Sequence, residues 1–244
     1  MQLTYYMLTD KGKRRNNEDY VGSYELNNEY CFALADGLGG HERGEVASRL
    51  VVETVGQVFA QENGYSEYFL REAFELAQQN LLDKQQKEDA YDELKTTLTV
   101  VAVGKESIGW GHVGDSRIYR FGNKKLINQT KDHSVPQMLV KMGEITEKDI
   151  RNHPDRSRLL KVMGVDWDRP KYDIEENVPI VAGDSYLMCS DGFWELIEEK
   201  QMLNCLKKAK TPQEWIELMQ VIVLENGKER NMDNYSAIAV WIRE

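Results

Sequence analysis

The chain has 244 residues, enough for one large domain or two small ones. Because 41% of the residues are hydrophobic and 9% aromatic, the chain can fill a substantial core, which excludes an intrinsically disordered protein. The formal net charge of −10 argues against nucleic acid or an anionic membrane as an obligatory partner, since both favour basic surfaces.

The predicted elements begin with strands at 3–9 and 30–35, and Asn27-Asn28 has turn chemistry between strand-like pieces. From about Gly44 the apolar residues recur at helical spacing, which predicts one helix there and a second over about 66–87. The later elements are strands at 97–103, 108–113, 117–121 and 125–128, short helices within 134–153, a strand at 186–190, helices at 201–208 and 213–225, and a last strand at 237–242.

Strands and helix pairs are segregated along the chain rather than alternating. This order favours antiparallel sheets with helices packed outside them, an α+β fold. No internal repeat and no Pro/Ser-rich linker interrupts the sequence, so we expect a single domain over residues 1–244.

Three cysteines, Cys31, Cys189 and Cys205, are odd in number and lack metal-ligand spacing. Two of them lie in apolar runs, which is typical of reduced, buried thiols. No signal segment opens the chain, and no apolar run approaches membrane-spanning length. We therefore expect a cytoplasmic protein without a membrane partner.

The segment from Ala35 to His41 places the carboxylate of Asp36 at the end of an apolar strand and follows it with three glycines in four positions. A buried charge and a run of glycines both destabilise a fold. The segment makes sense if Asp36 holds a cation that the bare backbone approaches closely. Other acidic positions at strand edges or in loops are Glu18-Asp19, Asp115, Asp191 and Asp233.

The acidic positions share a placement. Asp36, Asp115 and Asp191 each follow a strand-like run, and Asp233-Asn234 opens the last strand. A lone Asp-Gly or Asp-Asn is usually a simple turn. Four carboxylates at one rim of neighbouring strands, however, would repel strongly without cations. Oxygen ligands of this kind suit hard metal ions, so the pattern indicates a metal site and hydrolysis at phosphorus.

Seven pieces of the sequence carry a resemblance to a known family. They are DKGKRRNNED (10–19), ADGLGGHERGEVAS (35–48), TTLT (96–99), GDSR (114–117), TKDHS (130–134), SDG (190–192) and DNYS (233–236). In this order the pieces resemble the metal-dependent Ser/Thr protein phosphatases of type 2C, bacterial branch. Each piece alone is weak, but their number and order over about residues 3–242 make the combination specific.

The resemblance implies a four-layer α/β/β/α sandwich of two antiparallel sheets with helix pairs on the outer faces. It also implies a flap-like segment at about 135–158 beside the active site, a variable element that could tune substrate choice.

The same resemblance implies a set of metal ligands. Asp36 would bridge two Mn²⁺ or Mg²⁺ ions, Asp191 and Asp233 would complete one, and the Gly37 carbonyl and Glu18 would serve the other. Two such cations sharing a hydroxide would lower its pKa and stabilise charge as it displaces the seryl or threonyl oxygen, so no side-chain nucleophile is required.

Further residues have supporting roles by resemblance. Asp19 and Asn234 would orient the ligands, as outer-shell groups do. Asp115, together with Asp191, would form a third and weaker metal site.

A phosphate dianion entering an acidic rim needs a cation, and a guanidinium offers a bidentate match. The family's phosphate-binding arginine stands four residues before the glutamate of the first motif, which selects Arg14. The chain is one residue shorter than usual between Gly12 and the Glu-Asp pair, which leaves Arg15 open.

The histidines give weaker evidence of a catalytic role than the acidic residues and arginines do. His41 could protonate the leaving oxygen or contact substrate, or it could hydrogen-bond locally in its loop. His112, inside a strand, and His133, in a turn, are interpreted as structural.

Two pieces depart from the family pattern. LLKVMG (159–164) stands where a Thr-Arg pair is common, so contacts with substrate could differ there. Phe193-Trp194 stands where leucine is common. We interpret this pair as packing of the following helix, with a partner-binding surface as the alternative.

The leading hypothesis is a monomeric phosphatase that removes phosphate from phosphoserine and phosphothreonine on proteins, reversing a bacterial Ser/Thr kinase. The first alternative is a phosphatase-fold binding module of a regulatory complex that has lost turnover, against which the intact ligand set argues. The second is a carboxylate-rich calcium-binding structural protein, which has no EF-hand spacing to support it.

Overall fold

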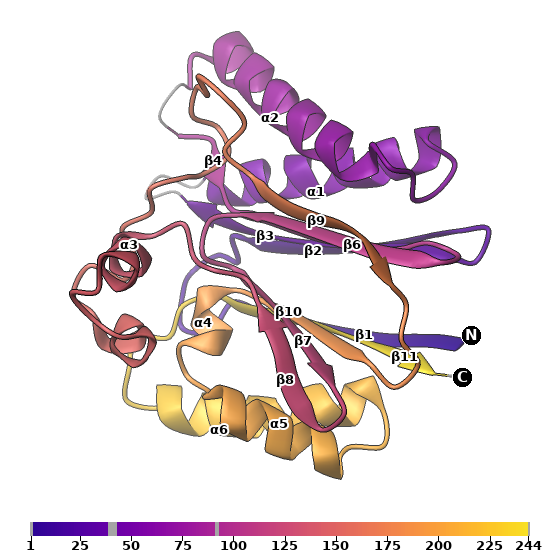
Figure 1. Ribbon diagram of the computed structural model, residues 1–244. Coiled ribbons are helices and arrows are strands. Elements are labelled where there is room, and N and C mark those ends of the chain that lie inside the picture. Colours follow the sequence, from indigo (N-terminus) through magenta and orange to yellow (C-terminus); the bar gives the residue numbers. More distant parts are fainter. Residues whose placement is uncertain (1, 39–42, 91–92, 244) are drawn as a thin grey trace.

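The computed structural model describes residues 2–38, 43–90 and 93–243. Within these residues two antiparallel sheets lie face to face between two layers of helices (Figure 1). One sheet contains, in spatial order, β1 (Gln2–Asp10), β11 (Tyr235–Arg243), β10 (Ser185–Cys189), β7 (Arg117–Gly122) and β8 (Lys125–Gln129). The other contains β2 (Asp19–Leu26), β3 (Glu29–Leu38), β5 (Leu98–Val103), β6 (Ser107–Val113) and β9 (Asp173–Pro179), with β4 (Lys95–Thr96) paired to the end of β3.

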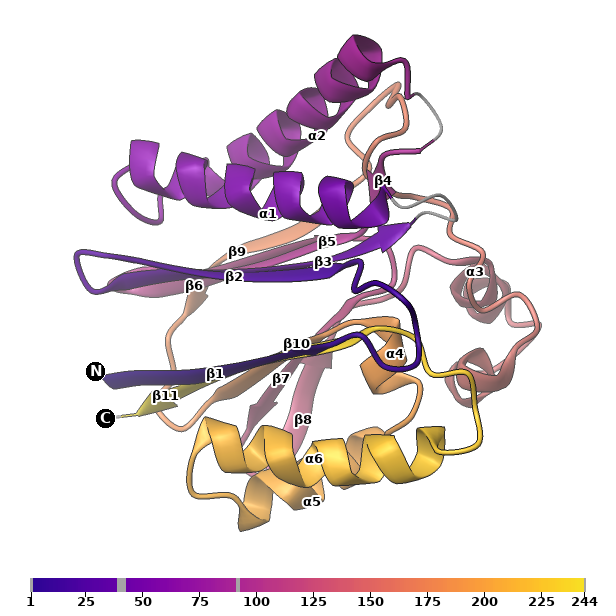
Figure 2. The ribbon, with the colours of Figure 1, turned by 180° about the vertical axis from the view of Figure 1, so that it is seen from behind.

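The helices cover the outer faces of the sheets (Figure 2). They are α1 (Gly44–Gln61) and α2 (Phe69–Glu88) on the β3 sheet, α5 (Glu199–Lys208) and α6 (Pro212–Gly227) on the β11 sheet, the short α4 (Asp191–Trp194) after β10, α3 (Val135–Met142) and the 3₁₀ helix η1 (Glu147–Asn152). The expected α+β sandwich with outer helix pairs is confirmed. The short helices expected within 134–153 are confirmed as α3 and η1.

Each layer boundary has its own apolar core. In β3, Phe32 and Leu34 point between the sheets, whereas Cys31, Ala33 and Ala35 point toward α1 and α2. This alternation is the period of two expected of a strand that is buried on both faces. The continuous apolar run that ends at Asp36 is therefore a central strand. The Asp36 carboxylate lies where the apolar cores on the two faces of this strand end.

Strand β9 is not among the strands predicted from sequence. Its residues alternate between exposed and half-buried positions along DIEENVP, and it lies at the edge of the sheet next to β6. Only Ile174 of this strand packs against the core under α1 and α2. Val178 packs against the core between the sheets, but the half-buried position between these two residues is occupied by Glu176, so the period-two apolar signal is too weak to predict a strand.

The sheets bring the acidic positions together at one end. The register of β2 on β3 places Asp19 directly opposite Asp36. In Figures 1 and 2 the region of α3 and α4 lies at the opposite end of the sheets from the chain termini. In the described part of the chain, no helix combines the length and apolar character needed to cross a membrane.

Candidate active site

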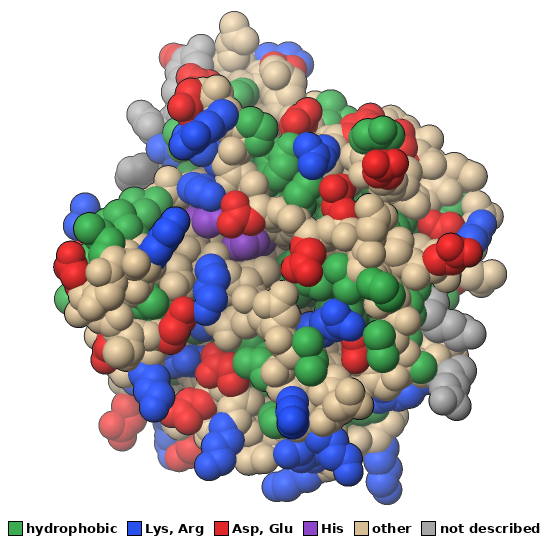
Figure 3. Space-filling view, in the orientation of Figure 1, with side chains coloured by type: hydrophobic (Ala, Val, Ile, Leu, Met, Phe, Trp, Pro, Cys, Tyr) green, Lys and Arg blue, Asp and Glu red, His purple; other side chains and the backbone are tan. Residues whose placement is uncertain are grey.

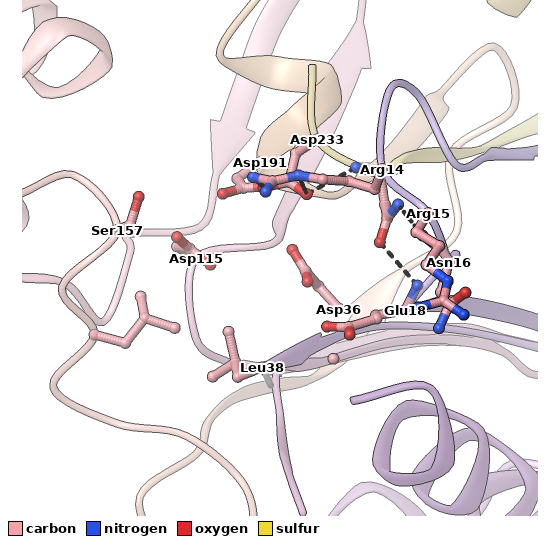
Figure 4. Close-up of a pocket in the computed structure, with 13 residues that line it drawn as sticks. Arg14, Arg15, Asn16, Glu18, Asp36, Leu38, Asp115, Ser157, Asp191 and Asp233 are labelled. Atoms are coloured by element: carbon pink, nitrogen blue, oxygen red, sulfur yellow. Dashed lines mark hydrogen bonds and ion pairs between the residues drawn. The ribbon is translucent and has the colours of Figure 1, made fainter. Parts of the chain in front are cut away.

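A cavity of about 380 Å³ opens between the two sheets where the acidic segments meet (Figure 4). Its lining comes from distant parts of the chain: Arg14, Arg15, Asn16, Glu18, Asp36, Gly37, Leu38, Asp115, Ser157, Leu159, Asp191, Asp233 and Asn234. All the metal ligands that the family resemblance implies are in this set. Figure 4 shows Asp36, Asp115, Asp191 and Asp233 around one space.

The end of β3 is held by hydrogen bonds that fix Asp36. The Asp36 main-chain N–H donates to Thr97 Oγ1 at 2.9 Å, and the Thr97 N–H donates to the Asp36 carbonyl at 2.8 Å. The next residue, Gly37, donates its N–H to the Glu18 carbonyl at 3.1 Å. A Cβ at Gly37 would lie 2.3 Å from the Gly44 carbonyl oxygen, so only glycine lets α1 begin this close to the site.

Glu18 is positioned from two sides. Ser48, on the first turns of α1, donates its hydroxyl to the Glu18 carbonyl at 2.6 Å. Asn234 accepts the Glu18 N–H through its Oδ1 at 2.8 Å and donates through Nδ2 to the carbonyls of Lys11 and Asn16. Asn234 thus ties the 11–18 loop to the start of β11, as the supporting role proposed for it requires.

Asp191 and Asp233 meet because α4 approaches β11 closely. Asp191 is the first residue of α4, and Asp233 stands two residues before β11. A Cβ at Gly192 would lie 2.1 Å from the Asn234 carbonyl oxygen. The glycine of the SDG piece therefore permits the contact that brings the two aspartates to the same cavity.

The carboxylates repel each other in the absence of a cation. Burial first, and then the carboxylates around them, raise the pKa of Asp36 and of Asp191 well above the ordinary 3.8. Burial also raises the pKa of Asp19 and of Asp115 to about 7.

The residues present fit hard divalent cations. The donors are oxygen atoms of carboxylates and main chain, as such ions prefer. Asp19 accepts a hydrogen bond from Ser190 on Oδ2 at 2.8 Å, but its buried Oδ1 has no partner in the described part of the chain. Such a cluster of charge is expected to be stable only with cations among the carboxylates.

Two guanidinium groups face the cavity. Arg14 forms a bidentate ion pair with Asp233, with Nε and Nη2 at 2.9 and 2.8 Å from the two carboxylate oxygens. Arg15 lines the same cavity. Both arginines therefore remain candidates for phosphate binding. Arg14 already contacts Asp233, one of the expected metal ligands.

His112 and His133 stack face to face, with ring centroids 4.5 Å apart. His112 Nε2 lies 2.8 Å from the Lys131 carbonyl, and His133 Nδ1 accepts the Gly114 N–H at 3.2 Å. Burial lowers the pKa of both rings, that of His133 to about 4. These contacts agree with the structural interpretation of both residues. Figure 3 shows the histidine surface on this face between acidic and basic side chains.

Three other predictions concern His41, the cysteines and the Phe193-Trp194 pair. His41 lies outside the described residues, so its role stays a prediction. Cys31, Cys189 and Cys205 are free and buried, as expected, and burial raises the pKa of each thiol. Phe193 and Trp194 are also buried, which confirms packing and excludes an exposed partner-binding surface.

Two residues from the segment that follows η1 also line the cavity. Ser157 belongs to the flap-like segment and Leu159 opens the LLKVMG piece, but no residue-level signal in the sequence singles out either side chain. Thr97 belongs to the TTLT piece, but only the structure shows that its hydroxyl accepts the Asp36 N–H.

Comparisons with known proteins agree with this geometry. The family model of protein phosphatase 2C matches residues 11–232. Over 235 residues the chain is 32% identical to the serine/threonine phosphatase stp of Listeria monocytogenes, covering 92% of this chain and 91% of that protein.

Solved structures are similar over the whole chain. The crystal structure of serine/threonine phosphatase Stp1 from Staphylococcus aureus matches with a TM-score of 0.88 and 30% identity, over 100% of this chain and 96% of that one. The catalytic domain of the phosphatase PstP in complex with two manganese ions matches with a TM-score of 0.83 and 28% identity, over 99% of each chain. The chain therefore belongs to the protein phosphatase 2C family.

Proposed function

We propose that this protein hydrolyses phosphoserine and phosphothreonine on proteins with the help of divalent cations, Mn²⁺ or Mg²⁺. The observation that carries the proposal is the single cavity in which four aspartates from both sheets, one glutamate and two arginines converge. Carboxylates suit the cations, and guanidinium groups suit the phosphate.

Each residue has a proposed role. Asp36, the central carboxylate, would hold two cations, with Asp191 and Asp233 on one, and Glu18 and the Gly37 carbonyl on the other. Asp115 and Asp191 would hold a third. When bound, divalent cations lower the pKa of water and neutralise charge that develops on the phosphoryl oxygens.

The phosphate is proposed to bind through Arg14. In the structure this guanidinium is bidentate to Asp233, and its side chain is 45% exposed. A cation on Asp233 would compete for those carboxylate oxygens and leave the guanidinium available to phosphate. The pair thus keeps Arg14 next to the position where the phosphate is needed.

The substrate class is proposed by analogy with relatives that are named serine/threonine phosphatases. We propose that the protein acts as a monomer in the cytoplasm on proteins phosphorylated by a Ser/Thr kinase. The flap-like segment 135–158 contributes to substrate choice, since Ser157 of this segment and the adjacent Leu159 line the cavity.

The test is phosphate release from a phosphothreonine peptide by the wild type and by Asp36→Asn in Mn²⁺. The substitution should lower kcat by about 10³-fold or more, because it removes the carboxylate proposed to hold both cations. Glu67→Gln, which removes one exposed charge outside both the cavity lining and the flap-like segment, should keep the wild-type rate. Wild-type turnover in Asp36→Asn would contradict the proposal.

A further inference from the structure

Trp194 links two acidic segments of the site. It is the last residue of α4 and is only 1% exposed. Its indole Nε1–H donates to the main-chain carbonyl of Asp115 at 2.9 Å. Because α4 begins at Asp191, this hydrogen bond joins the two segments whose aspartates, Asp115 and Asp191, line the same cavity.

Two guanidinium groups hold the indole ring. Arg117 Cζ lies 3.4 Å from the ring centroid, and Arg151 Cζ lies 5.6 Å from it. Arg117 is fixed in turn by a buried bidentate ion pair with Asp132, at 2.7 Å for both contacts. Arg151, from η1, also donates to the Trp194 carbonyl at 3.1 Å. Cation–π contacts are strongest where water is excluded, so the ring has little freedom to move.

The main chain around Asp115 is held mainly at its flanks. Gly114 has a φ of +103° and exchanges hydrogen bonds with His133. Ser116 Oγ lies 3.0 Å from Thr97 Oγ1. The Trp194 indole donates to Asp115 itself, so it acts on the residue that carries the carboxylate.

We propose that Trp194 is a positioning residue, which fixes the Asp115 main chain relative to Asp191 so that their two carboxylates are ready to share a divalent cation. The inference rests on the proposed function, which assigns these carboxylates to metal binding. Loss of the indole N–H would leave the Asp115 carbonyl without this donor and give the segment freedom that cation binding must remove.

The experiment measures Mn²⁺ binding to the whole protein by titration calorimetry. The wild type should show tight sites and a weaker one, and Asp115→Ala should remove the weaker one. Trp194→Phe keeps an aromatic ring in contact with the two arginines but lacks the N–H. This substitution should raise the Mn²⁺ dissociation constant of the weaker site about tenfold. The dissociation constants of the tight sites should change by less than about twofold.

A matched control is available in α6. Trp215 is fully buried, and its Nε1–H donates to the Met202 carbonyl at the same 2.9 Å. It lies in the core beneath α5 and α6 and does not line the cavity. Trp215→Phe should lower thermal stability as Trp194→Phe does, yet leave the weaker Mn²⁺ site unchanged.

Three results would overturn the inference. They are an unchanged affinity of the weaker Mn²⁺ site in Trp194→Phe, an equal loss of affinity in Trp215→Phe, or an Asp115→Ala variant that keeps every Mn²⁺ site of the wild type. Should the phenylalanine variant fail to fold, benzothienylalanine at position 194 gives the same test, because it keeps the shape of the indole without the N–H. The proposed function fails separately, if the wild type binds Mn²⁺ as described but releases no phosphate from phosphopeptides.

Discussion

Replacing Asp19 by asparagine should stabilise the metal-free protein and at the same time impair it as an enzyme. Asp19 is buried, one of its carboxylate oxygens has no partner in the described residues, and burial raises its pKa from 3.8 to about 7. An acid whose pKa is raised on folding costs no stability below its unfolded pKa. The cost grows as the pH rises toward the folded pKa.

The size of the effect follows from that shift. Each tenfold change in a proton equilibrium is worth about 1.4 kcal/mol, so the raised pKa of Asp19 costs the folded state about 4 kcal/mol at pH 8, where the carboxylate is ionised in both states. At pH 5 the cost is about 2 kcal/mol, because the folded protein must bind a proton that the unfolded chain has mostly released. Asparagine keeps the shape and still accepts the Ser190 hydroxyl, but it carries no charge. Asp19→Asn should therefore exceed the wild type in unfolding free energy by these amounts in EDTA.

The assay is urea unfolding in EDTA at pH 5 and pH 8, with Glu67→Gln, an exposed site outside the cavity lining, as the control for a change of one unit in net charge. With Mn²⁺ present the stability advantage should disappear, and kcat should fall by about 10- to 100-fold because the ligands lose an outer-shell partner. A variant less stable than the wild type at pH 8 in EDTA, or a stability difference that is the same at both pH values, would refute the reasoning.

Two further predictions concern the arginines and the thiols. Arg14→Ala should raise KM for a phosphopeptide by about tenfold or more with a smaller effect on kcat, because a guanidinium that binds phosphate equally in ground and transition states contributes uniform binding. If steady-state kinetics instead show the KM effect in Arg15→Ala alone, then Arg15 is the phosphate ligand. Iodoacetamide should leave the rate unchanged, since Cys31, Cys189 and Cys205 are buried and burial raises the pKa of their thiols; inactivation that follows alkylation of one cysteine would contradict a thiol-independent mechanism.

Much of the site could be predicted because its ligands stand at strand ends. The apolar run before Asp36 and the glycines after it are local signals, and a buried strand followed by a close backbone approach explains both. The same holds for Asp191, which follows the short apolar strand β10, and for Gly192, whose missing Cβ admits the Asn234 carbonyl. The two layers of helices follow from helical spacing in the segments that form α1, α2 and α6.

What could not be predicted depends on contacts between distant segments. Arg14 and Asp233 are 219 residues apart, and Trp194 and Asp115 are 79 apart, so no local pattern pairs them. The position of Ser157 in the cavity lining depends on how η1 and the following loop fold back over the site. Strand β9 needs the edge of a sheet that is already formed, because only two of its residues, Ile174 and Val178, pack against apolar cores.

The most direct test of the central claim is phosphate release from a phosphothreonine protein by the EDTA-treated chain as Mn²⁺ is restored. Metal-dependent hydrolysis predicts no release in EDTA, recovery of the rate as Mn²⁺ is added, and no recovery in Asp36→Asn. Release in excess EDTA at the rate of the untreated protein would contradict it.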